Sequence, residues 1–253
     1  MPEILKQIYK PSMKVGQVYA KIYGSDANAL PIGNVLELGL GHAEDVQTQP
    51  DMTALGGGNH AEVRRVTEVK ITAKLADLNV VNMSRAIFGE ASAQTAGAIT
   101  DEAHTATLGG LVRLDHIQPS AVTVKKGATA LGATEVTMAG NYEVRPEGIF
   151  VAADALGVTD ADKLWITYTH GAYAVIQALT TKSVELALTF GGLNEADDGN
   201  PVVVDIFRAS QGITKNLALI SKGFDALDIE GSVLVDPTKT GTGISRYYKV
   251  SMA

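Results

Sequence analysis

The sequence predicts a mainly β protein with antiparallel sheets and one short α-helix. Short runs in which apolar and polar residues alternate recur along the chain, and a period of two is typical of half-buried strands. The chain has 26 glycines but only 8 prolines, as expected for many tight turns between short strands. A helical pattern of apolar residues follows Asn79. These three observations set the predicted fold class.

Composition and charge narrow the class of protein. With 253 residues, 45% hydrophobic and 19% charged, the chain can bury a substantial core as one large or two modest domains. It has no cysteine, which excludes disulfides, a thiolate nucleophile and a cysteine metal site, and fits assembly in a reducing cytoplasm. The net charge of −7 argues against an outer surface that grips nucleic acid. The N-terminus lacks a signal-peptide core and no apolar run approaches ~20 residues, so we expect neither export nor a membrane span.

The N-terminal region combines strand candidates with one irregular segment. Strands are predicted at Ile4–Tyr9, Gln17–Tyr23 and Asn34–Leu38. From Gly41 to Ala61 the alternation ends, and the segment carries acids but no lysine or arginine. A structureless loop of about 20 residues inside a compact domain is usually functional or disordered. From the residues alone, both a mobile surface loop and a functional segment stay open.

The stretch from Glu62 to Gly89 has the clearest pattern. Its strand places apolar side chains on one face and polar ones on the other: Val69, Ile71, Ala73 and Leu75 against Lys70, Thr72 and Lys74. In the helix that follows, Asn79 is the predicted N-cap, and Leu78 can pack on Met83. Gly89 is the predicted left-handed residue after the helix.

The helix is predicted to have one apolar face, made of Val80, Val81, Met83, Ile87 and Phe88. Asn82 and Arg85 fall on the opposite side. We expect the apolar face to pack against another part of the structure, and Arg85 to lie on the opposite, more exposed side.

The rest of the chain is again predicted to be strands. Ala91–Ala98 is rich in small residues and is expected to be a connection, followed by a strand within His104–Ile117. Between Pro119 and His170, five short strands make a small β-module: Val122–Lys125, Glu135–Met138, Asn141–Val144, Gly148–Val151 and Leu164–Tyr168. Val184–Phe190 is predicted to pair with Val202–Phe207 across a turn at Gly191–Asn200. Further strands are expected within Leu217–Ile220, Phe224–Val235 and Ile244–Val250.

Nothing in the sequence predicts catalytic, cofactor-binding or metal-binding residues. The five histidines lie in unrelated contexts without metal-site spacing: His42, His60, His104, His116 and His170. Asp115-His116 could imitate part of a catalytic triad, but no Gly-x-Ser-x-Gly motif supplies a nucleophile. Asn194–Gly199 has clustered oxygen ligands without the spacing of a calcium loop, and Gly39–Gly41 and Gly241–Gly243 do not continue into a phosphate-binding unit. We therefore expect a protein that is not an enzyme and needs no cofactor.

The order and spacing of several segments resemble the major tail tube proteins of long-tailed, non-contractile bacteriophages. The segments are Gly56–His60, the arginine-bearing strand, Leu75–Asn79, Ala86–Gly89, Glu185–Ala196, Val202–Phe207, Leu217–Val235 and Tyr247–Val250. The resemblance implies an antiparallel β-sandwich or barrel core of the tail-tube type, formed by residues 1–118 and 171–253. Residues 119–170 would be an inserted β-rich module.

The same resemblance implies a structural virion protein that self-assembles into stacked hexameric rings, a hollow tail tube through which DNA passes. Its partners would be copies of itself and the tape-measure, tail-tip and tail-terminator proteins. DNA would transit without specific binding, and assembly would occur in the host bacterial cytoplasm.

The resemblance also implies two functional regions. The ring-stacking loop would contain Glu44, Asp45, Asp51, Met52, Leu55, Gly56, Gly57 and Gly58. Helix packing or subunit contact would involve Val80, Met83, Arg85, Ile87 and Phe88. Two alternatives remain open: a β-rich carbohydrate-binding module or enzyme with a loop-built site, and the tube protein of a contractile or secretion apparatus.

Overall fold

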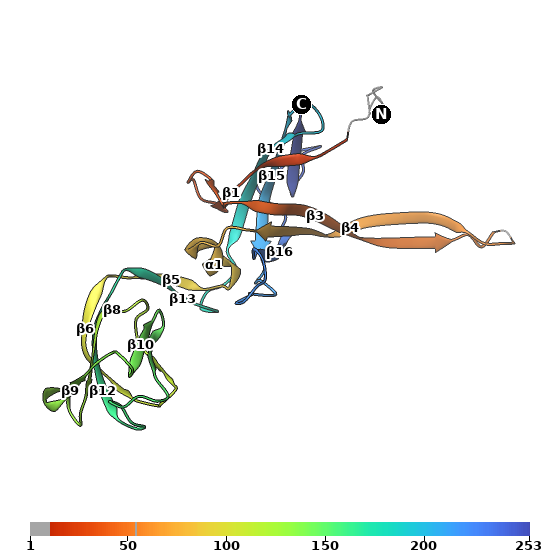
Figure 1. The fold of residues 1–253 in the computed structure, drawn as a ribbon. Coiled ribbons are helices and arrows are strands. Elements are labelled where there is room, and N and C mark those ends of the chain that lie inside the picture. The colour runs from red at the N-terminus through yellow and green to blue at the C-terminus, as the bar shows by residue number, and fades with distance from the viewer. Residues whose placement is uncertain (1–10, 54) are drawn as a thin grey trace. The chain divides into compact units, whose positions relative to one another are not determined.

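A computed structural model describes residues 11–53 and 55–253 (Figure 1). The predicted fold class is confirmed at the coarse level, since the chain is mainly β, its strands pair in antiparallel sheets, and the described residues contain one α-helix. The strand predicted at Ile4–Tyr9 lies outside the described residues. No helix in the described part of the chain is long and apolar enough to span a membrane.

The chain divides into two compact units: unit 1, residues 1–91 and 176–253, and unit 2, residues 92–175. The elements of unit 1 are β1 (Lys14–Ile22), β2 (Leu30–Pro31), β3 (Val35–Pro50), β4 (Asn59–Leu75), α1 (Val80–Ala86), β14 (Glu185–Asn194), β15 (Asn200–Gln211), β16 (Leu227–Val233) and β17 (Tyr248–Met252). The strands form one sheet in the order β2-β1-β14-β15-β16-β4-β3, and β17 also pairs with β15. β5 (Glu90–Gln94) and β13 (Tyr173–Gln177) pair where the chain passes between the units.

The predicted alternation in β4 is confirmed. Val69, Ile71 and Leu75 are buried, whereas Lys70, Thr72 and Lys74 are exposed. Val69 and Ile71 pack with Ile206, Ala209 and Val233, which lie on β15 and β16. A second, smaller cluster joins Leu75, Ala86 and Leu227 beneath α1. The apolar face of one strand therefore helps to form both cores of unit 1.

The predicted pairing of the two long C-terminal strands is also confirmed. β14 pairs with β15, and Leu188 lies opposite Ile206. The prediction of a strand at Leu217–Ile220 is wrong, because these residues lie in an irregular segment that leaves Leu219 and Ile220 exposed. Strand structure resumes only at β16 and β17.

Unit 2 contains all five strands predicted between Pro119 and His170. Its elements are β6 (Gly97–Thr105), β7 (Leu111–Arg113), β8 (Ser120–Lys126), a short 3₁₀ helix η1 (Ala130–Gly132), β9 (Thr134–Val136), β10 (Tyr142–Arg145), β11 (Gly148–Val151) and β12 (Lys163–His170). They form two sheets, with the orders β6-β12-β8-β9 and β10-β11-β7.

The boundary of the module differs from the predicted 119–170. β6 pairs with β12 and β7 pairs with β11, so the preceding strands are integral to the unit. Ala106, Val112 and Leu114 belong to the same buried cluster as Ile166 and Tyr168. Unit 2 therefore starts at Ser92, and the expected connection Ala91–Ala98 contributes to β5 and β6.

Candidate assembly surface

The segment predicted as an irregular loop, Gly41–Ala61, is mostly part of a long hairpin. β3 and β4 pair from Val35–Leu75 to Pro50–Asn59 with three local register shifts, and the described residues of the turn are 51–53 and 55–58. The loop prediction was wrong because the outer part of this hairpin has no buried face. A strand pair that is exposed on both sides does not need the apolar alternation by which strands are recognised.

We call residues Glu44–Val66 the free hairpin. β4 pairs with β16 only from Lys70 to Leu75, so beyond this point β3 and β4 pair only with each other. Figure 1 shows the two strands continuing past the rest of their sheet. Every described residue of the free hairpin is exposed except Asp51, which is half-buried.

The free hairpin exposes apolar side chains that a partner could cover. Val46, Val63 and Val66 are 40%, 53% and 56% exposed, and at the tip Met52 and Leu55 are 86% and 106% exposed. A two-stranded hairpin without a packed face is only marginally stable in water. This geometry suits a segment that is completed by docking on another surface.

The predicted ring-stacking residues all lie on the free hairpin. Glu44 forms an ion pair with Arg64 across the strands at 2.7 Å, and the Asp45 carboxylate accepts a hydrogen bond from Gln47. Asp51 begins the turn, where its Oδ1 accepts hydrogen bonds from the Thr53 amide at 2.8 Å and hydroxyl at 2.6 Å.

The glycines Gly56, Gly57 and Gly58 have φ values of 108°, 67° and 144°, respectively. L-residues with a side chain rarely adopt this region, so the turn depends on glycine here.

The N-terminal cap of α1 is confirmed, because the Asn79 side chain accepts a hydrogen bond from the Asn82 amide at 2.8 Å. The predicted apolar face is wrong. The buried residues of α1 are Asn82 and Ala86, whereas Val80 and Val81 are 42% and 53% exposed.

A distant backbone group explains this orientation. The Asn82 side chain donates hydrogen bonds to the Ile32 carbonyl at 2.8 Å and to the Asp77 carbonyl at 3.2 Å. An amide that satisfies two carbonyls can occupy an inner position that periodicity assigns to an apolar residue. Met83, Arg85, Ile87 and Phe88 are all half-buried.

The left-handed residue after α1 is Phe88, with φ 49°, and not Gly89 as predicted. Gly89 is required for a different reason. A Cβ at this position would lie 2.6 Å from Ile176 Cγ2 and 2.9 Å from the Gln177 carbonyl oxygen. The absence of a side chain lets the segment between α1 and β5 approach β13 closely.

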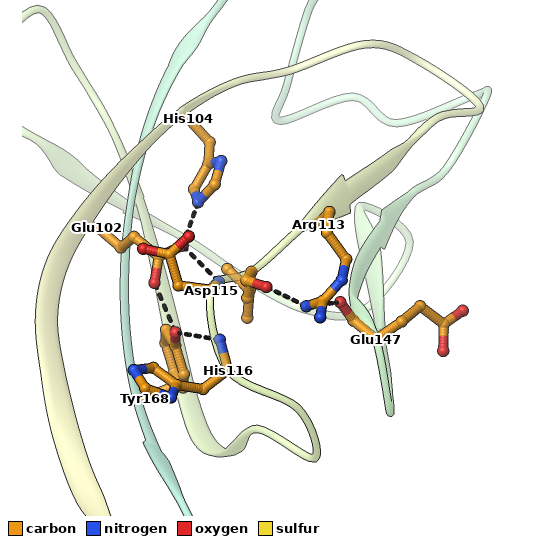
Figure 2. Close-up of polar contacts among 8 residues, drawn as sticks. Glu102, His104, Arg113, Asp115, His116, Glu147 and Tyr168 are labelled. Atoms are coloured by element: carbon orange, nitrogen blue, oxygen red, sulfur yellow. Dashed lines mark hydrogen bonds and ion pairs between the residues drawn. The ribbon is translucent and has the colours of Figure 1, made fainter. Parts of the chain in front are cut away.

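Unit 2 contains a second candidate site, a buried network around Tyr168 (Figure 2). The histidines were predicted to lie in unrelated contexts, but the structure stacks His116 on His170 with ring centroids 3.8 Å apart. The Tyr168 hydroxyl donates to Glu102 Oε2 at 2.5 Å and accepts a hydrogen bond from the His116 amide at 3.3 Å. Glu102 Oε1 is bonded to His104 Nε2 at 2.5 Å.

The environment of this network shifts two pKa values. Burial of Tyr168 and its hydrogen bond to Glu102 raise the pKa of the tyrosine well above its ordinary value. Burial would raise the pKa of Glu102, but hydrogen bonds from Tyr168, His104 and the Asp115 amide outweigh burial and lower it. The carboxylate is thus held in its charged form.

The Tyr168 network has a structural explanation, because it supplies hydrogen-bond partners for polar groups that the core buries. Tyr168 is fully buried, and both oxygens of Glu102 already have protein donors. Beside it, Arg113 donates to the carbonyls of Leu114 and Glu147 (Figure 2). Asp115 contacts Glu102 through its backbone amide. The arrangement satisfies a buried hydroxyl and carboxylate.

In the Asn194–Gly199 turn, the first of the clustered oxygen ligands already binds another part of the chain. The Asn194 side chain accepts a hydrogen bond from the Met13 amide at 2.8 Å and donates to the Pro11 carbonyl at 3.2 Å, which occupies it. Residues 11–53 and 55–253 contain no group of three or more histidine, aspartate or glutamate side chains that could hold a metal ion.

Comparison of the sequence with known proteins identifies a family whose description names no activity. No curated protein matches the sequence. A family model described as "Protein of unknown function UCP028589" matches residues 11–251, which includes both units. The chain therefore belongs to this uncharacterised family.

Proposed function

We propose that this protein is a structural subunit that assembles into stacked hexameric rings, forming the hollow tail tube of a non-contractile bacteriophage. The free hairpin is the observation that carries the proposal. It is long, its two strands pair only with each other, and it exposes apolar side chains from its base to its tip. A neighbouring ring would supply the surface that it lacks.

The sheet of unit 1 supports assembly through its edges. Val69 and Ile71 of β4 pack with Ile206 and Ala209 of β15, which suits a sandwich or open barrel of the tail-tube type. Among the described residues, β17 pairs only with β15, and β1 pairs with β2 only at Tyr19 and Ala20. Edges of this kind invite pairing with another chain, and closure around a ring removes them.

The polar face of this sheet, opposite its buried side chains, suits the lining of a conduit that does not bind DNA. Tyr19, Thr189, Asp205 and Lys249 lie in register across β1, β14, β15 and β17, and Lys249 lies 3.6 Å from Asp205. Mixed polar side chains with a paired cation offer few free charges to phosphates. Transit without specific binding is what the proposed tube requires.

The lysine side chains of β4 are also close to carboxylates. Lys70 lies 3.5 Å from Glu68 and Lys74 lies 3.8 Å from Asp228. These cations already have carboxylate neighbours, so they would not form a continuous phosphate-binding stripe. By this proposal, the protein's other partners are the tape-measure, tail-tip and tail-terminator proteins, and its location is the virion tail.

The proposal is tested with the purified full-length protein. Sedimentation velocity over a wide range of concentrations should show a monomer giving way to rings and longer particles. Negative-stain microscopy should then show hollow tubes of uniform diameter with a constant axial repeat. A protein that stays monomeric at every concentration, and that does not join tubes when a tail-tip complex is added, would contradict the proposed function.

A further inference from the structure

Two residues that line a cleft at the end of α1 have hydrogen-bond donors without acceptors among the described residues. This helix-end cleft lies between the end of α1 and residues 181–184, and its lining includes Ser84, Arg85, Phe88, Lys182 and Gln211. Arg85 is half-buried, and in the described part of the chain its guanidinium has no hydrogen-bond or ion-pair partner. The Gln211 side-chain nitrogen is buried, also without a partner among the described residues.

A carboxylate is the acceptor that suits the Arg85 guanidinium. Buried polar groups in folded proteins are nearly always hydrogen-bonded, so a half-buried guanidinium without a partner indicates a missing acceptor. The two oxygens of a carboxylate can accept from one guanidinium at the same time. Lys182 adds a second positive charge to the lining, against the single carboxylate of Glu90.

Exposed apolar side chains on α1 and just before it favour a protein segment over a small anion as the occupant. Val81 lies one helical turn before Arg85, so the two share one side of α1, and Val81 is 53% exposed. Leu78, just before the helix, is 46% exposed. A desolvated charge beside exposed apolar residues is the usual composition of an energetically important interface site.

The tip of the free hairpin carries complementary side chains. Asp51 uses Oδ1 to bind Thr53, and these hydrogen bonds lower the pKa of Asp51, which keeps it charged. Its Oδ2 has no hydrogen-bond partner among the described residues. Met52 and Leu55, on the same turn, are almost fully exposed.

The hairpin tip cannot reach the cleft of its own chain. The tip and α1 lie at opposite ends of β4 (Figure 1), whose 17 residues span roughly 55 Å at about 3.3 Å per residue. A contact between tip and cleft must therefore join two copies, and a head-to-tail contact of this kind builds rings or open filaments.

We propose that Arg85 of one copy binds the Asp51 carboxylate at the hairpin tip of a second copy. Met52 and Leu55 then pack on Leu78 and Val81. This inference rests on the proposed function, because it assigns the receptor for the free hairpin within the assembly.

Charge reversal tests the contact in the full-length protein. Arg85→Glu and Asp51→Arg should each raise the concentration needed for half-maximal assembly at least ~10-fold, since each leaves a like-charged pair. The double variant should return to within ~3-fold of wild type, because the two charges are exchanged. Lys222→Glu is the matched control and should assemble like wild type, because Lys222 is exposed and does not line the cleft.

Cysteine cross-linking gives a second readout, because the chain has no native cysteine. A Met52→Cys protein mixed with a Ser84→Cys protein should form a disulfide-linked heterodimer under mild oxidation. Adding Arg85→Glu to the second protein should abolish the cross-link. Met52→Cys mixed with Ser221→Cys should give none.

The outcomes separate this inference from the proposed function. Two results would show that the receptor is wrong while the proposed tube function stands. In the first, wild-type protein and both charge-reversal variants form tubes. In the second, wild-type protein forms tubes, the single variants fail without rescue in the double variant, and no cross-link forms. If wild-type protein forms no tubes but the Arg85-dependent cross-link appears, the contact stands and the tube function is wrong.

Discussion

Unit 2 buries most of its large hydrophobic side chains in one core, whereas unit 1 leaves many of them exposed. Unit 2 buries twelve residues in one cluster, whereas the clusters of the larger unit 1 contain five and three buried residues. Of the large exposed hydrophobic side chains among the described residues, only four lie in unit 2: Leu111, Leu131, Met138 and Leu156.

Polar groups show the same difference. In unit 2, the buried hydroxyl of Tyr168 and the carboxylate of Glu102 are bonded to each other and to further groups. In unit 1, the Arg85 guanidinium and the Gln211 side-chain nitrogen have no hydrogen-bond partner among the described residues. The comparison suggests that stability is concentrated in unit 2 and association in unit 1, and the predictions below are designed to break that division.

The largest expected effect is on assembly, from shortening the free hairpin. Joining Glu44 to Val66, which are paired across the strands, through an Asn-Gly turn removes the segment and keeps the register of the remaining hairpin. We expect a folded monomer with near-native circular dichroism and no tubes. A full-length control with Gln47→Thr and Gln49→Thr should assemble. Tubes of normal length from the shortened protein would show that the hairpin is not an assembly element.

The next largest effect is on the stability of unit 2. Ile166 is fully buried in its core, so Ile166→Ala should lower the free energy of unfolding by about 2–5 kcal/mol. Val81→Ala, an exposed site in unit 1, should change it by less than about 0.5 kcal/mol. Denaturant titration followed by circular dichroism reports both units, and the fluorescence of the single tryptophan, Trp165, reports unit 2 separately. Equal losses in both variants would contradict the division.

The elements that could be predicted from the sequence are those fixed by local patterns. The alternation in β4, the Asn79 cap and the short strands of unit 2 depend on neighbouring residues, and all are present. The free hairpin was missed because alternation reports one buried face, and this segment has none in a single chain.

The remaining errors come from long-range contacts. The inward turn of Asn82 depends on the Ile32 carbonyl, 50 positions earlier in the chain. The start of unit 2 depends on pairing between β6 and β12. The helix-end cleft could not be predicted at all, since Arg85 and Gln211 come together only through the fold. The family resemblance pointed to Arg85 as a subunit contact, but only the structure shows that its guanidinium has no partner among the described residues.

A smaller effect is expected from the Tyr168 network. Glu102→Gln should destabilise unit 2 by about 1–3 kcal/mol at pH 7, because a buried charged acceptor is lost. Because the folded-state pKa of Glu102 is lowered, its contribution is present above the ordinary carboxylate pKa of about 4.3 and is lost as pH falls through the folded value. The gap between variant and wild type should therefore narrow in acid.

The control for this measurement is Glu143→Gln, since Glu143 is exposed and forms a surface ion pair with Arg145. It should change stability by no more than about 1 kcal/mol. A gap for Glu102→Gln that stays constant from neutral pH to pH 3 would mean that the charge of Glu102 is not what stabilises the network.

The smallest effect on assembly is expected from removing unit 2. β5 and β13 are paired strands, so the two ends of the unit lie one strand spacing apart, about 4.8 Å. Joining Gln94 to Tyr173 through an Asn-Gly turn should convert them into a hairpin and leave unit 1 intact. Deleting only 120–169 would instead leave β6 without β12, so its failure would say nothing about assembly. The excised protein should form tubes with the wild-type axial repeat, and their outer diameter should fall if unit 2 decorates the outside. Loss of assembly by a folded unit 1 would show that unit 2 makes subunit contacts, and association would then have to be assigned to both units.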